Sequence, residues 1–159
     1  MNTSIQKQNE TGTNQITVST GVQTYTFNEG CTLTFNPTDS GFVKRLYAAL
    51  DTLRSRHEEY TASIGEKEGT AAVFDEAEKL DADTRGIIDG LFGKPVCAEL
   101  FGDMNVCALA DGLPLWMNLL LAVVDLIDEK MAAETESVNP RLEKYLAKYR
   151  AKKKANAKK

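Results

Sequence analysis

Two acidic residues, Asp81 and Asp83, occur where a calcium-binding loop could begin. Such a loop needs oxygen ligands at its first, third and fifth positions, a glycine at the sixth and a bidentate glutamate at the twelfth. Gly86 supplies the sixth position, but Arg85 occupies the fifth and Phe92 the twelfth. A cation would meet a positive charge and would lack its strongest ligand. We therefore expect helix capping by Asp81 or Asp83, and no calcium site.

A phosphate-binding loop is a second possible site, because residues 86–95 end in a Gly-Lys-Pro segment. The pattern G-x-x-x-x-G-K-[ST] places glycine and lysine as they occur at Gly93 and Lys94. It also requires a glycine where this chain has Ile88 and a serine or threonine where it has Pro95. The sequence therefore does not predict phosphate binding by this segment.

The remaining residues with catalytic or metal-binding potential are one histidine, His57, and three cysteines, Cys31, Cys97 and Cys107. The cysteines form no C-x-x-C pair, so the close paired spacing of a zinc site is missing. No serine or cysteine has a recognisable neighbour in sequence that would activate it as a nucleophile. Three widely spaced cysteines are typical of reduced, mostly buried thiols in a cytoplasmic protein. We expect a protein without enzymatic activity, metal or cofactor.

Charge is distributed unevenly along the chain. Residues 1–138, here called the body, carry 10 Lys and Arg against 22 Asp and Glu, whereas residues 139–159 carry nine Lys and Arg against Glu143 alone. An acidic surface repels phosphate, which argues against nucleic acid as a partner of the body. Only the basic tail has the charge to contact nucleic acid.

The basic tail also has apolar residues at the i, i+3, i+4 and i+7 spacing of one helix face. We call these residues the tail stripe: Leu142, Tyr145, Leu146 and Tyr149. Lys144 and Lys148 lie beside the stripe. A helix with an apolar stripe and basic flanks is suited to binding a partner protein. The alternative is a tail that only keeps the protein in solution, but such a tail needs no apolar stripe.

The elements that must position these residues begin with short strands. Two or three strands are predicted, at 16–19, 22–27 and 31–35, because β-branched and aromatic residues there are separated by turn-forming residues. We expect them to form a small N-terminal β-hairpin or meander that packs on the helices that follow. Residues 1–15 are predicted to be a disordered polar arm.

A long helix of about 25 residues is predicted to start with Thr38 or Asp39 as its N-cap and to continue to Gly65. Its apolar residues recur at heptad spacing, and we call them the 43–64 seam. They are Val43, Leu46, Leu50, Leu53, His57, Tyr60 and Ile64. The seam is expected either to pack within the same domain or to mediate self-association or binding of another helix.

The rest of the body reads as helix. Residues 71–80 and 83–92 are predicted to form one broken helix or two helices, and 96–101 a short helix. A buried helix is predicted from Pro114 to about Glu134. Its residue Trp116 is a candidate for partner binding, because tryptophan is enriched at interfaces, with core packing as the alternative.

The predicted fold class is mainly α with a small N-terminal β-hairpin or meander, an α+β protein built as a compact helical bundle. Residues 16–138 are predicted to form a single globular domain and 139–159 a basic helix with a frayed tail. The longest apolar stretch, 113–127, is shorter than the ~20 residues of a membrane span, so no membrane contact is expected. The first residues lack the apolar core of a signal peptide, which supports a cytoplasmic location.

The order of these elements resembles that of small tail assembly chaperones encoded by phages and prophages of Gram-positive bacteria, of the siphophage type. The resemblance covers about residues 16–150, with the β-segment ITVSTGVQTYTFNEGCTLTF, a long helix, the segment FGDMN…ALADGLPLWMNLLLAVVDLID and a lysine-rich end. It implies a non-enzymatic protein of the host cytoplasm that binds the long helical tape measure protein. Such a chaperone keeps the tape measure soluble until tail tube proteins polymerise around it.

A second class of function is compatible with the acidic body. The chain could be an inhibitor encoded by a phage or another mobile element, which binds a host protein through its acidic helical surface. The charge of the body is the observation that favours this alternative.

Overall fold

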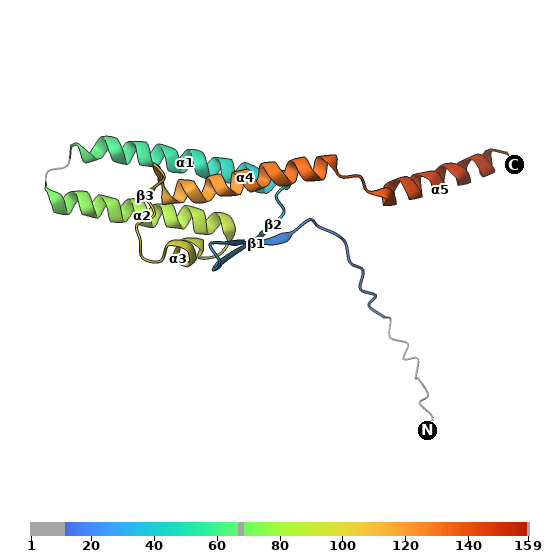
Figure 1. The fold of residues 1–159 in the computed structure, drawn as a ribbon, viewed down its shortest axis with the longest axis horizontal. Coiled ribbons are helices and arrows are strands. Elements are labelled where there is room, and N and C mark those ends of the chain that lie inside the picture. Colours follow the sequence, from blue (N-terminus) through green and yellow to red (C-terminus); the bar gives the residue numbers. More distant parts are fainter. Residues whose placement is uncertain (1–11, 67–68, 159) are drawn as a thin grey trace, which may run out of the picture.

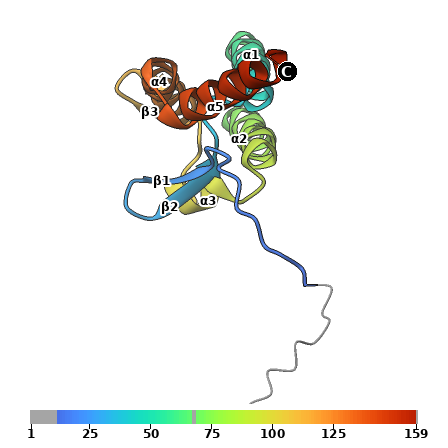
Figure 2. The same ribbon diagram turned by 90° about the vertical axis from the view of Figure 1, so that its right-hand side faces the viewer.

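The computed structural model describes residues 12–66 and 69–158. The predicted polar arm, 1–15, lies largely outside these residues. Three long helices run side by side, with a β-hairpin and a short helix packed together on one side of them (Figures 1 and 2). In chain order the elements are β1 Gln23–Phe27, β2 Cys31–Phe35, α1 Ser40–Ile64, α2 Thr70–Phe92, α3 Val96–Phe101, β3 Leu109–Ala110, β4 Leu113–Pro114, α4 Leu115–Glu136 and α5 Pro140–Ala157.

The N-terminal sheet is a hairpin of two antiparallel strands, β1 and β2, in which Tyr25 pairs with Leu33. The inner face of β2 is buried through Cys31, Leu33 and Phe35. Residues 16–19 form no strand, and Ile16 is exposed to solvent. The two-strand form of the prediction is therefore confirmed and the third strand is wrong, because its apolar residues find no surface to cover.

Helix α1 has the predicted start and length. The Asp39 carboxylate caps it by accepting a hydrogen bond from the backbone N–H of Gly41 at 2.9 Å. Within the 43–64 seam, Leu46 and Leu53 are buried, and every other seam residue is half-buried. The seam packs against the chain's own α2 and α4, as the intramolecular interpretation expects. Self-association through the seam stays a prediction.

Helix α2 is continuous from Thr70 to Phe92, so the predicted break near residue 82 is wrong. Leu80, Thr84 and Ile88 lie four residues apart and are buried on one face, and this packing holds the helix together through its acidic middle. Asp81 and Asp83 lie inside the helix and cap neither end.

Asp81 has a structural role that its spacing in sequence does not reveal. Its carboxylate accepts hydrogen bonds from Arg85 Nε at 3.1 Å and from the backbone N–H of Val106 at 2.8 Å. Arg85 Nη2 in turn donates to the carbonyl oxygens of Gly102 and Met104, at 2.8 and 2.6 Å. The pair therefore fastens the loop that follows α3 to the side of α2.

Helix α4 completes the core, with buried residues along the face it turns to α1 and α2. These residues are Trp116, Leu119, Leu120, Val123 and Ile127. The predicted fold class is confirmed: the protein is mainly α, with a small N-terminal β-hairpin. None of the described helices is long and apolar enough to cross a membrane.

Substitution of Leu53 by aspartate tests the packing of the seam. Leu53 is fully buried, so Leu53→Asp places an unpaired charge in the core and should lower the free energy of unfolding by about 3 kcal/mol or more. Thr52→Asp, at an exposed neighbouring position, should change it by less than about 0.5 kcal/mol. Urea unfolding followed by circular dichroism measures both. Equal stability of the two variants would show that the seam is not a core element.

Asp81 and Asp83 form a matched pair for testing the link between α2 and the following loop. Asp81→Ala should cost about 1–3 kcal/mol, because it leaves Arg85 Nε and the Val106 N–H without their acceptor. Asp83→Ala should cost less than about 1 kcal/mol, because the Asp83 side chain is 51% exposed and its ion pair with Arg56 is a surface contact. Thermal unfolding of both variants gives the comparison, and a larger loss for Asp83→Ala would contradict this assignment.

Candidate functional site

The candidate partner-binding site is α5, which starts independently of α4. Helix α4 ends at Glu136, and the chain is extended at Ser137 and Asn139. The Asn139 side chain then caps α5 by accepting a hydrogen bond from the backbone N–H of Arg141 at 2.9 Å. Pro140 occupies the first turn, where its missing N–H costs no helix hydrogen bond. The sequence itself thus ends one helix and begins another.

The tail stripe is open to solvent. Leu142, Tyr145 and Tyr149 are 62%, 50% and 64% exposed, and Leu146 is half-buried. No residue of α5 is buried, and Figure 1 shows the helix extending away from the body beyond the end of α4. The structure therefore brings the four predicted stripe residues onto one helix face and leaves that face uncovered by the chain itself.

Basic side chains surround the stripe. Arg141 and Lys144 approach the ring of Tyr145, with 5.9 and 5.8 Å between the cationic group and the ring centroid. Lys148 follows one turn later and is exposed. Basic residues continue to the end of α5, where their positive charges interact favourably with the negative end of the helix dipole.

The lysine-rich end is helical over most of its length. Helix α5 continues through Ala157. Alanine and lysine are both strong helix formers, which explains the longer helix.

Trp116 is not part of the site. Its side chain is 1% exposed and lies in the core at the start of α4. Core packing, the alternative interpretation of Trp116, is therefore what the structure shows. His57 lies nearby, with 6.4 Å between its ring centroid and that of Trp116. Its Nδ1 atom is buried and has no hydrogen-bond partner among the described residues, so His57 acts as a packing residue.

The three cysteines lie in environments that disfavour a thiolate. Burial and the neighbouring Asp89 carboxylate raise the pKa of Cys97 to about 12. Burial and Asp81 raise the pKa of Cys107 to about 11. Burial and contact with Glu99 raise the pKa of Cys31 as well. All three thiols are therefore protonated at neutral pH and are weak nucleophiles.

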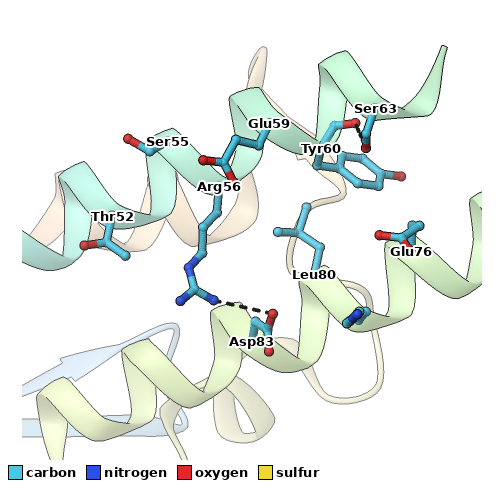
Figure 3. A pocket seen from close by; sticks show the side chains of 10 residues that line it. Thr52, Ser55, Arg56, Glu59, Tyr60, Ser63, Glu76, Leu80 and Asp83 are labelled. Carbon is cyan, nitrogen blue, oxygen red and sulfur yellow. Dashed lines mark hydrogen bonds and ion pairs between the residues drawn. The ribbon is translucent and has the colours of Figure 1, made fainter. Parts of the chain in front are cut away.

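A groove of about 750 Å³ lies between α1 and α2. This groove was not predicted from the sequence. Figure 3 shows Arg56 reaching across it from α1 to Asp83 on α2, where the Nη1–Oδ2 distance is 3.4 Å. We call it the α1–α2 groove, and its lining residues are Thr52, Ser55, Arg56, Glu59, Tyr60, Ser63, Glu76, Lys79, Leu80 and Asp83. The small polar residues on the α1 side are the only sequence signal for it, because they leave the space between the helices unfilled.

Within residues 12–66 and 69–158 there is no group of three His, Cys, Asp or Glu side chains that could hold a metal ion. The α1–α2 groove and the tail stripe are two surface features of these residues that could hold a ligand. A scan against protein-family models, a search of curated proteins and a search of solved structures each found no match.

Proposed function

We propose that this protein is a non-enzymatic tail assembly chaperone that binds a phage tape measure protein in the host cytoplasm during tail assembly. The observation that carries this proposal is the uncovered tail stripe of α5, with basic side chains beside it. The order of elements in the sequence resembles that of tail assembly chaperones, and this resemblance indicates a tape measure protein as the partner.

The chemistry of α5 suits a helical partner. Apolar residues at i, i+3, i+4 and i+7 are the anchors by which an amphipathic helix packs into a groove or along another helix. A tape measure protein is long and helical, and its apolar faces need covering until the tail tube forms around it. The basic residues of α5 raise the rate at which the protein associates with acidic segments of such a partner. The acidic body keeps the complex in solution.

Loss of the two tyrosines in the tail stripe tests the proposal in the full-length chain. Tyr145→Ser with Tyr149→Ser should weaken capture of a phage tape measure protein by at least about tenfold, because each tyrosine contributes apolar contact area. The matched control is Ala147→Ser with Ala151→Ser, at exposed positions of α5 outside the stripe, which should bind as the wild type does. Pull-down with purified tape measure protein at low and moderate salt measures the difference. Equal capture by both double variants would remove the stripe from the mechanism.

A truncation after Asn139 adds a second arm to the same experiment. We expect the melting temperature of the 1–139 form to stay within about 2 °C of the full chain, because no residue of α5 is buried. Capture should be lost with α5. Undiminished capture by the truncated form would show that the tape measure protein binds the body rather than α5.

A further inference from the structure

The α1–α2 groove lies in the most acidic part of the body. Residues 51–83, which form the second half of α1, the connection and the first half of α2, carry ten Asp and Glu against four Lys and Arg. Its lining carries three carboxylates, Glu59, Glu76 and Asp83, against two basic side chains, Arg56 and Lys79, and is therefore net negative although Arg56 pairs with Asp83. A basic ligand is therefore favoured here over an acidic one.

The groove also offers apolar contact between its charged rims. Tyr60 projects from α1 and Leu80 from α2 toward the space between the helices (Figure 3). Its matching ligand is an elongated basic group with an apolar side, and α5 has both properties. Helix α5 carries seven Lys and Arg against Glu143, and its large apolar residues are confined to the tail stripe.

The α5 of the same chain cannot bring its stripe to Tyr60 and Leu80 in the middle of this groove. Helices α1 and α4 run in opposite directions, and His57 lies level with Trp116 near the start of α4. From Trp116 to Glu136, α4 extends about 30 Å away from that level. If α5 folded back along the body, its residues 140–149 would recover about 14 Å and the extended break before them at most about 10 Å. The stripe would stop short of Tyr60, which lies on the far side of His57.

We infer that α5 of one copy of this chain docks in the α1–α2 groove of a second copy. The tail stripe then contacts Tyr60 and Leu80, and the lysines beside it face the carboxylates on the groove rims. The inference rests on the proposed function in one respect, that the same stripe binds the tape measure protein. Self-docking keeps the stripe covered until the tape measure protein competes for it.

Sedimentation velocity of the full-length protein, without any partner, tests self-docking. The wild type should associate as its concentration rises at low salt. The association should weaken at least about tenfold in 1 M NaCl, where the Debye length falls to about 3 Å. A wild type that stays monomeric at all concentrations would overturn the inference.

Two full-length variants locate the contact. Tyr145→Ser with Tyr149→Ser removes the stripe, and Glu59→Arg reverses a charge on the groove rim. Each should stay monomeric where the wild type associates. Glu58→Arg makes the same charge change at the adjacent exposed position, outside the groove lining, and should associate as the wild type does. Equal effects of Glu58→Arg and Glu59→Arg would overturn the groove as the binding site, and thermal melting checks that all variants fold.

Mixing the two monomeric variants gives the decisive comparison. The stripe variant keeps an intact groove and the Glu59→Arg variant keeps an intact α5, so the mixture should form a heterodimer although neither variant associates alone. A mixture that stays monomeric would overturn docking between copies. Because no tape measure protein is present, this result is independent of the capture experiment, and either proposal can fail while the other stands.

Discussion

Phe42, Leu46 and Leu53 form a buried face of α1, and the elements of the body are arranged around it. Phe42 stacks on Phe35 of β2, with 4.8 Å between ring centroids, and also meets Phe92 at the end of α2 at 5.9 Å. Helix α4 covers the same helix on another side. A hairpin of two strands is marginal alone, so β1 and β2 depend on this face for their stability. Most of the large apolar residues in the elements of the body therefore pack against one another.

Exposed apolar residues occur singly over the body, as at Phe74 and Leu109, whereas α5 carries three of them, Leu142, Tyr145 and Tyr149, on one helix face. A helix contributes little stability in isolation, since most helical stability in proteins comes from packing of an apolar face. In α5 that face packs on no other part of the chain that the structure describes, and no residue of α5 is buried. The body and the tail carry opposite net charges, and the proposed docking between copies depends on this difference.

Features set by local sequence were predictable, and features set by contacts between distant residues were not. The Asp39 cap, the heptad face of α1 and the stripe of α5 each depend on residues a few positions apart, so periodicity and capping rules locate them. The bond between Asp81 and the Val106 N–H joins residues 25 positions apart and has no local signature. The α1–α2 groove depends on the distance between two helices. The side chains of one helix alone do not determine that distance. The position of Trp116 could not be predicted from sequence either, because tryptophan occurs both at interfaces and in cores.

The short break at Ser137 and Asn139 has a consequence for the orientation of α5. Each helix end beside it is closed locally, α4 by the Ser137 N–H bonded to Glu134 and α5 by the Asn139 side chain. Rotation about the few backbone bonds between them changes the direction of α5 without breaking a contact of the core. An arm of 18 residues, about 27 Å long, can then point in different directions while the body keeps its fold. The tail stripe can therefore meet another surface in more than one orientation without any rearrangement of the body.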